Sequence, residues 1–257
     1  MIKFYPLFSG SKGNCQLIQT ENTNILIDVG VSYKKIKEAL TSLSLSIKDI
    51  DGIFITHEHI DHCRAVKQIA KNEEIKIYAT SGTIKGIDIE YAHYIEIDKL
   101  KEVEIKNLKI KHFSTSHDCL MPCGYTVETD DSKLAISTDL GIMTSTVLKN
   151  LENSNLVYIE SNHDVGMLEM GPYPYFLKRR VLGEEGHLSN EACSKTITHL
   201  VKHGVKSFIL AHLSEHNNTP ELALETVLSD LAMSNLNVAN LNISIATQDL
   251  STEVFKL

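Results

Sequence analysis

The segment Thr56-His57-Glu58-His59-Ile60-Asp61-His62 decides how the rest of the chain is interpreted. It continues directly from Gly52–Thr56, a short apolar run typical of a buried strand, so its side chains are expected on a loop at a sheet edge. Imidazole and carboxylate groups bind divalent metal ions well. Three histidines and one aspartate are too many for one tetrahedral site that also takes ligands from outside the segment. The segment therefore predicts a site for two metal ions, and a solvated histidine-rich loop is the alternative.

Further ligands are expected where other predicted strands end. His117 follows an alternating strand pattern, Asp139 follows Lys133–Ser137, and His212 follows the apolar run at 208–211. A single histidine in such a place is more often structural than a ligand. Three strand-terminal ligands at wide spacing, however, are what a two-metal site at a sheet edge requires.

Composition and charge limit the class of protein. The chain has 257 residues, 42% hydrophobic and 23% charged, which is typical of a globular protein with one large domain or two small ones. A formal charge of −8 disfavours a generally basic nucleic-acid-binding surface. Five scattered cysteines indicate free thiols in a reducing compartment. No apolar run long enough for a bilayer and no signal-peptide pattern is present, so we predict a cytoplasmic protein without a membrane partner.

The pattern of apolar residues predicts an α/β fold. Strands come first, helices follow, and the order then repeats. The predicted strands are Ile2–Phe8, Cys15–Gln19, Asn24–Asp28, Gly52–Thr56, Ile75–Ala79, Lys101–Phe113, Gly124–Glu128, Lys133–Ser137, Leu156–Ile159, Ser207–Ala211 and Ile243–Ala246. The predicted helices are Tyr33–Leu43, Cys63–Ile69, Asn190–Lys202 and Pro220–Leu231, with Ser189 or Asn190 and then Thr219 as N-caps of the last two.

Taken in chain order, these motifs resemble the metallo-β-lactamase-fold hydrolases. Asp28 in Leu26-Ile27-Asp28-Val29-Gly30, the His57–His62 run, His117, Asp139 and His212 follow the family order. The resemblance implies a four-layer αββα sandwich with two mixed sheets flanked by helices. It implies one domain over 1–257, with related halves of roughly 1–125 and 126–257. The interval from Asp139 to His212, 73 residues (212 − 139), is too short for a β-CASP insertion.

The same resemblance implies a ligand set and its cofactors. His57, His59 and His117 would hold one ion; Asp61, His62 and His212 would hold the other; and Asp139 would bridge them. Asp28 would support the loop without binding metal. The ligand types suit two divalent ions, Zn²⁺ or Mn²⁺, and Fe is also possible.

Longer motifs resemble the YycJ/WalJ (VicX) branch of this family, which is bacterial and cytosolic and is associated with DNA exonuclease activity. These motifs are Ser9–Asn14, Glu160–Asp164, Gly171–Pro174, Gly186–Asn190 and His212–Ser214 followed by Asn217-Asn218. The resemblance implies a nucleic-acid substrate, DNA rather than RNA, and degradation in the 5′-to-3′ direction.

Residue roles in such a hydrolase can be predicted. A hydroxide bridging the metals would be the nucleophile, Asp61 would orient it, and His187 would protonate the leaving group. Glu160 would orient His187, whose alternative role is to begin the helix at Asn190. Lys178-Arg179-Arg180 is either a phosphate clamp or an exposed helix face, and Ser9–Asn14 either binds phosphate through its backbone or forms a tight turn. The predicted substrate-binding residues are Ser9, Ser11, Asn14, Asn162, His163, Tyr173, Arg179 and Arg180.

Two other classes of function stay open at this point. A thioesterase, lactonase or cyclic phosphodiesterase of the same fold would use the same ligands on a small molecule. A non-catalytic or redox module is the other possibility, although a diiron redox relative would carry glutamate where this chain has His59.

Overall fold

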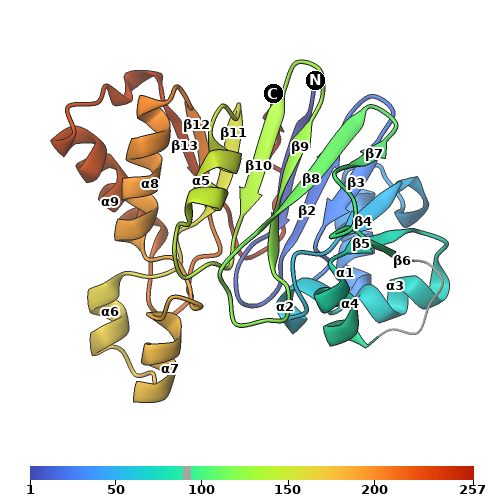
Figure 1. The fold of residues 1–257 in the computed structure, drawn as a ribbon, viewed down its shortest axis with the longest axis horizontal. Coiled ribbons are helices and arrows are strands. Elements are labelled where there is room, and N and C mark those ends of the chain that lie inside the picture. The colour runs from blue at the N-terminus through green and yellow to red at the C-terminus, as the bar shows by residue number, and fades with distance from the viewer. Residues whose placement is uncertain (89–93) are drawn as a thin grey trace. The chain divides into compact units, whose positions relative to one another are not determined.

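The chain forms two compact units, shown within the ribbon of Figure 1. The computed structural model describes residues 1–88 and 94–257. The first unit comprises Met1–His112, Cys119–Ser132 and Thr247–Leu257, and the second comprises Phe113–Asp118 and Lys133–Ala246. Neither unit is one continuous stretch of sequence. One domain with halves of 1–125 and 126–257 stays a prediction.

The first seven-stranded sheet belongs to the first unit and has the order β14-β1-β2-β3-β4-β5-β6. Strands β14, β1, β2 and β3 pair antiparallel, whereas β3 to β6 pair in parallel. Their bounds are β1 Lys3–Phe8, β2 Cys15–Gln19, β3 Asn24–Ile27, β4 Gly52–Phe54, β5 Ile77–Ala79, β6 Tyr94–Glu96 and β14 Phe255–Lys256.

The second seven-stranded sheet has the order β13-β12-β11-β10-β9-β8-β7. Strands β10 to β13 pair in parallel, and β7 and β8 form an antiparallel hairpin. The bounds are β7 Val103–Ile105, β8 Leu108–Ser114, β9 Cys123–Glu128, β10 Lys133–Ser137, β11 Leu156–Glu160, β12 Ser207–Ala211 and β13 Asn242–Ile245. The predicted α/β class with two mixed sheets is confirmed.

The helices flank these sheets, and six of the described ones, α1, α4, α5, α6, α8 and α9, begin at a residue whose side chain caps the helix. Ser189 caps α8 through its side chain, and Thr219 caps α9 with Pro220 in its first turn, as predicted. The helices are α1 Tyr33–Ser42, α2 Ile60–Cys63, α3 Val66–Asn72, α4 Ser81–Ile87, α5 Ser145–Leu151, α6 Val165–Met170, α7 Tyr175–Val181, α8 Asn190–Lys202 and α9 Pro220–Met233, with short 3₁₀ turns at Ile47–Asp49 and Val238–Asn240.

Two differences from the predicted elements have simple physical causes. The predicted strand Lys101–Phe113 is split into β7 and β8, because Lys106 turns the chain with a left-handed φ of 52°. Helices α4 to α7 were not predicted; each has six or seven residues, too few to give a clear helical period.

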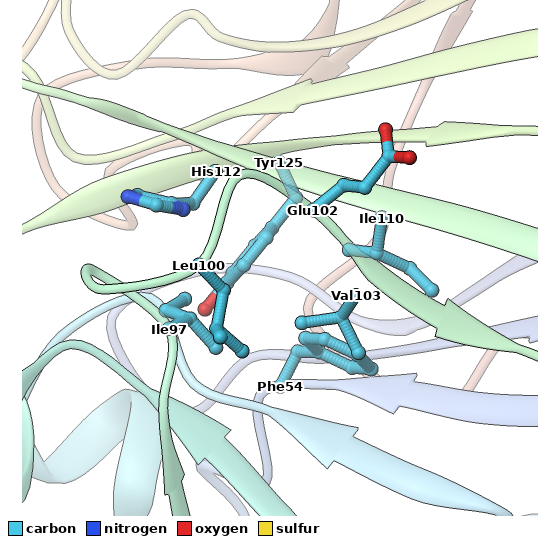
Figure 2. Close-up of a pocket in the computed structure, with 8 residues that line it drawn as sticks. All are labelled: Phe54, Ile97, Leu100, Glu102, Val103, Ile110, His112 and Tyr125. Carbon is cyan, nitrogen blue, oxygen red and sulfur yellow. The ribbon is translucent and has the colours of Figure 1, made fainter.

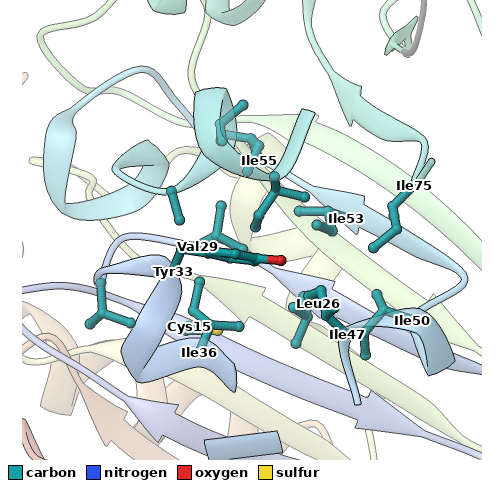
Figure 3. Close-up of a cluster of buried hydrophobic side chains, with 14 of the residues drawn as sticks. Cys15, Leu26, Val29, Tyr33, Ile36, Ile47, Ile50, Ile53, Ile55 and Ile75 are labelled. Carbon is teal, nitrogen blue, oxygen red and sulfur yellow. The ribbon is translucent and has the colours of Figure 1, made fainter. Parts of the chain in front are cut away.

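Each unit has its own apolar core. Figure 3 shows the core of the first unit, where α1 packs Tyr33 and Ile36 against Leu26 and Ile53 of the sheet. In the second unit, apolar side chains of α8 and α9 pack with those of β10 to β12, including Ile197, Val227 and Phe208.

A small pocket in the first unit contains none of the predicted site residues. It is lined mainly by apolar side chains around Phe54 and Tyr125, and it has no room for a water molecule. Figure 2 shows that His112 and Glu102 turn away from the apolar group.

All five cysteines are free thiols. Across residues 1–88 and 94–257, the helices are too short or too polar to cross a bilayer.

Candidate metal centre

Three predicted site residues follow strands in an unusual backbone conformation. Asp28 follows β3, Asp139 follows β10 and His212 follows β12, with φ values of 58°, 58° and 55°. The left-handed region is uncommon for residues other than glycine, although Asp, Asn and His enter it more readily than most. At each position the chain turns sharply as it leaves the sheet.

In the first unit, the Asp28 carboxylate organises the histidine-rich loop. It accepts hydrogen bonds from the Thr56 backbone N–H at 2.9 Å, the Thr56 hydroxyl at 3.0 and 3.1 Å, and His62 Nδ1 at 2.7 Å. Asp28 is 1% exposed, and burial raises the pKa of its carboxyl group while His62 and Thr56 oppose that shift. Asp28 therefore lies where a residue that supports the histidine-rich loop was predicted, bonded to Thr56 and His62 of that loop.

The imidazoles of the loop gather at one place. The ring of His57 lies 4.7 Å from that of His59 and 4.1 Å from that of His62, centroid to centroid. His57 Nδ1 contacts the Thr56 hydroxyl at 3.0 Å, and His62 Nε2 lies 3.6 Å from a carboxylate oxygen of Asp61. The residues that the sequence grouped as ligands are therefore close together within this unit.

The Ser9–Asn14 turn supports the same loop. The Asn14 backbone N–H donates to the Asp61 carbonyl at 2.8 Å, and the Asn14 side-chain amide donates to His62 Nε2 at 3.0 Å and to the Gly10 carbonyl at 3.1 Å. Gly30 allows this approach, because a Cβ atom there would lie 1.6 Å from the Asp61 carbonyl oxygen.

In the second unit, parallel pairing brings the ends of β10, β11 and β12 to one edge. Asp139, Glu160 and His212 lie at that edge. His212 Nδ1 is 2.9 Å from Glu160 Oε1 and 3.4 Å from Asp139 Oδ1. His187 Nδ1 also contacts Glu160 Oε1, at 2.8 Å. One side-chain oxygen or nitrogen atom of each of Asp139, Glu160, His187 and His212 thus lies within 4.8 Å of the others.

Glu160 is fully occupied as a hydrogen-bond acceptor. Oε1 accepts from His187 and His212, and Oε2 accepts from the Leu140 and Leu188 backbone N–H groups at 3.1 and 3.2 Å. A carboxylate has about four lone-pair positions, so these four donors use its capacity. Burial alone would raise the pKa of Glu160, but His187 and His212 bring it down to about 2. Glu160 is thus an ionised group that orients two imidazoles.

His117 is held from its Nδ1 side. That atom contacts the Gly186 carbonyl at 2.9 Å, while Nε2 lies 3.9 Å from Asp139 Oδ1. Burial lowers the pKa of His117, so the neutral, metal-binding form of its imidazole is favoured.

Comparisons with known proteins identify the family of this chain. Residues 23–213 match the family model described as a beta-lactamase superfamily domain. The chain belongs to the metallo-β-lactamase superfamily. It is 34% identical to exodeoxyribonuclease WalJ of Streptococcus pneumoniae over 91% of this chain and 90% of the relative, and 33% identical to exodeoxyribonuclease YycJ of Bacillus anthracis over 88% of each. The metallo-β-lactamase fold protein YhfI from Bacillus subtilis has a similar fold, with a TM-score of 0.73 at 15% identity over the whole of both chains. These relatives confirm the WalJ/YycJ branch of the superfamily for this chain.

The substrate-binding residues predicted for this metallo-β-lactamase-fold chain differ in exposure. Ser9 and Asn14 are buried, whereas Ser11 is exposed. Asn162 is also buried, and its amide donates to the His212 carbonyl at 2.8 Å. His163 is buried beside it, with Nδ1 3.3 Å from the Asn162 side-chain oxygen. Asn14 and Asn162 therefore hold the backbone or ring of predicted ligands, and their contact with substrate stays a prediction.

The remaining predicted substrate-binding residues are on or near α7. The Tyr173 ring meets His216 edge-on at 6.0 Å, Arg179 is exposed, and Arg180 forms a two-pronged ion pair with Asp118 that includes Nη2 to Oδ1 at 3.0 Å. Of the two arginines in the predicted phosphate clamp, Arg180 is therefore paired with a carboxylate of the protein, whereas Arg179 is exposed.

Sequence reasoning missed several supporting contacts of this superfamily site. It paired Glu160 with His187 alone, although Glu160 also holds His212. It gave no role to Thr56, which bonds to Asp28 and His57. The signal for Thr56 was its place at the start of the histidine run, but a hydroxyl there could equally face solvent.

Proposed function

We propose that this protein is a metal-dependent phosphodiesterase that removes nucleotides from a DNA end. The observation that carries the proposal is the 34% identity to exodeoxyribonuclease WalJ over nine-tenths of both chains. The two ligand sets described above supply the imidazole and carboxylate groups that such a hydrolase needs. Degradation in the 5′-to-3′ direction is part of the proposal. A cytoplasmic location is also proposed, because five free thiols suit a reducing compartment.

The proposed ligands are those expected from the family motifs. His57, His59 and His117 would hold one ion; Asp61, His62 and His212 would hold the second; Asp139 would bind both. The donor chemistry fits at three positions, because His57, His117 and His212 each use Nδ1 toward an oxygen of the protein and would present Nε2 to a metal. His62 uses Nδ1 toward Asp28 in the same way, and the Asn14 amide that contacts its Nε2 would have to turn away for that atom to bind a metal. Two ions of Zn²⁺ or Mn²⁺ would lower the pKa of water toward about 7 and offset charge on phosphate oxygens.

His187 is the proposed proton donor to the leaving oxygen. Its Nδ1 donates to Glu160 Oε1 at 2.8 Å, so Nε2 is the atom that would give up the proton. The Glu160 carboxylate fixes the orientation of the ring, and its low pKa keeps it ionised across the working range. We propose that Asp61 orients the attacking water, because it lies next to His62 in the loop.

The test is hydrolysis by the purified chain loaded with Mn²⁺ or Zn²⁺. Substrates are 5′-phosphorylated and 5′-hydroxyl single-stranded DNA, the matching RNA, a thioester and a cyclic phosphodiester. We expect mononucleotides to be released from DNA, with a His59→Ala variant at least about 100-fold slower. A His203→Ala variant is the matched control, since His203 is an exposed histidine at the end of α8, outside the proposed ligand set.

Turnover of the thioester or cyclic phosphodiester with intact DNA would instead assign a small-molecule hydrolase. Full activity of the His59→Ala variant would contradict the proposed ligand set. An end label separates the directions, because 5′-to-3′ degradation releases a 5′ label in the first turnover.

A further inference from the structure

Helices α6 and α7 carry large apolar side chains that the core does not use. Met170 is 89% exposed, Tyr175 75% and Phe176 73%, and all three lie within seven residues of one another. Isolated exposed apolar residues are ordinary, whereas a group of them indicates a binding surface. We call Met170, Tyr175 and Phe176 the aromatic ridge.

The aromatic ridge stands on a fixed support. Asp164 caps α6 by accepting a hydrogen bond from the Met167 N–H at 2.7 Å, and Leu168 of α6 is completely buried. The Lys178 ammonium group of α7 donates to the Glu169 carbonyl of α6 at 2.7 Å, which ties the two helices together. Figure 1 shows them as a pair of short helices between β11 and α8 in the chain. The exposed rings are therefore presented by folded helices.

The turn between these helices is closely packed as well. A Cβ atom on Gly171 would lie 2.7 Å from the Met167 carbonyl oxygen and 2.9 Å from the Asn217 side-chain oxygen. Tyr173, in the same turn, contacts His216 edge-on. The Gly171–Pro174 motif thus sets the position at which α7 begins.

The far end of α7 is packed against the segment that carries His187. The His187 backbone N–H donates to the Val181 carbonyl at 3.0 Å, and Gly186 approaches so closely that a Cβ atom there would lie 2.2 Å from the same oxygen. A helix rises about 1.5 Å per residue, so the backbone positions of Tyr175 and Phe176, six and five residues before Val181, lie about 9 and about 7.5 Å from this contact along the helix axis. The aromatic ridge is therefore a near neighbour of the proposed proton donor.

The spacing of residues along α7 places an aromatic ring and a guanidinium group on the same side of the helix. Tyr175 and Arg179 are four residues apart and share one helix face, as do Phe176 and Arg180. Arg180 pairs with Asp118, whereas Arg179 is exposed. The Tyr175–Arg179 face thus combines an exposed aromatic surface with an exposed guanidinium group.

We propose that the exposed surface of α7 binds single-stranded DNA, with unpaired bases stacked on Tyr175 and Phe176, which point from adjacent sides of the helix, and a backbone phosphate on Arg179. The inference rests on the proposed function and names the form of DNA that the site takes. Both faces of a paired base inside a duplex are covered by its neighbours, so a base within a strand must be unpaired to stack on an exposed ring. Every base has a π-face, which makes such binding tolerant of sequence, and the adjacent cation suits a polyanion better than an apolar protein surface.

The test measures binding apart from cleavage. Metal-loaded protein is titrated with a fluorescent oligothymidylate whose phosphorothioate linkages resist hydrolysis, and with a duplex of the same length. Tyr175→Ala should weaken single-strand binding about tenfold, Tyr175→Ala/Phe176→Ala should weaken it further, and Tyr175→Phe should retain it. Met233→Ala, which removes a side chain 74% exposed on α9, is the matched control and should bind like the wild type. Arg179→Ala should reduce the slope of log affinity against log salt by about 1.

A second measurement, photochemical crosslinking, reports which part of the protein the bound DNA contacts. An oligonucleotide carrying 5-bromodeoxyuridine should crosslink to the peptide that contains Tyr175 and Phe176. Crosslinks confined to other peptides, or unchanged single-strand binding by the double variant, would overturn the inference. If the wild type hydrolyses DNA but the double variant binds normally, the ridge proposal fails and the proposed function stands. If the ridge binds the oligonucleotide but no DNA is hydrolysed, the proposed function fails and the ridge stands.

Discussion

The hydrogen bonds around Asp28 allow a sharp prediction for Asp28→Asn. The substitution keeps the shape of the side chain, and asparagine accepts the left-handed backbone at this position as readily as aspartate does. Only one carboxylate oxygen is replaced, by an amide NH₂ group. In the wild type, both oxygens accept hydrogen bonds from Thr56 or His62, so the new donor group must face a donor.

Each way of accommodating the amide has a cost. If NH₂ faces the Thr56 backbone N–H, that buried donor loses its acceptor. If NH₂ faces His62 Nδ1, the imidazole proton must move to Nε2, where it meets the Asn14 amide donor at 3.0 Å. A buried donor without an acceptor costs about 1–3 kcal/mol, and loss of a supporting carboxylate weakens metal affinity about 10- to 100-fold.

The assays are metal titration by calorimetry, chemical unfolding, and nitrogen-15 NMR of the His62 tautomer. We expect the variant to bind metal about 10- to 100-fold more weakly and to lose about 1–3 kcal/mol of unfolding free energy. Asp51→Asn is the control: Asp51 accepts from the Asn24 N–H at 3.0 Å and pairs with Lys106, so its loss should lower stability and leave metal affinity unchanged. Wild-type metal affinity in Asp28→Asn, with the proton still on Nδ1, would refute the reasoning.

Three further predictions follow from single features of the site. Gly30→Ala forces a Cβ atom to within 1.6 Å of the Asp61 carbonyl, so thermal unfolding should show a loss of more than about 3 kcal/mol, and an unchanged melting temperature would contradict that close approach. Glu160→Gln removes the ionised partner of His187 and His212, so kcat should fall about 100-fold with little change in KM; a change in KM alone would show that Glu160 acts on binding. Burial lowers the pKa of His163 to about 4, so the unfolded chain, with a pKa near 6.5, binds the proton first and stability should fall between about pH 6.5 and 4. His163→Gln should reduce that loss by about 3 kcal/mol in urea unfolding, and an identical pH profile would exclude His163 as its source.

The sequence predicted the strands of the two sheets and the polar residues at their ends because both depend on short-range patterns. A buried apolar run of four or five residues followed closely by Asp or His indicates a strand and the turn at its end, as for Asp139 and His212, whose role as ligands stays a prediction. Helices α6 and α7 could not be predicted in this way. Their six and seven residues present Tyr175 and Phe176 to solvent, so they lack the apolar stripe on which helix prediction depends.

The hydrogen-bond partners of the predicted ligands could not be predicted from the sequence either. Asn14 and His62 are 48 residues apart, and Glu160 and His212 are 52 apart, so their contacts depend on the register of strands rather than on any local motif. The parallel pairing of Glu160 with Ala211 is what brings the carboxylate beside His212. A motif can name such residues, but only the sheet register assigns which of them touch.

Three residues at strand ends have both a local and a long-range feature: each adopts a left-handed backbone, and its side chain belongs to the candidate site. Asp28, Asp139 and His212 each leave a strand at a φ of 55–58°, a conformation that costs a non-glycine residue about 1–3 kcal/mol unless its surroundings hold it. Asp28 is held by Thr56 and His62, and His212 is held by Glu160 and Asn162. The hydrogen bonds that hold Asp28 and His212 in place therefore also compensate for the backbone strain at these two strand ends. Glycine at these positions would relieve the strain and remove the chemistry, which explains why a costly conformation coincides with residues that carry a carboxylate or an imidazole.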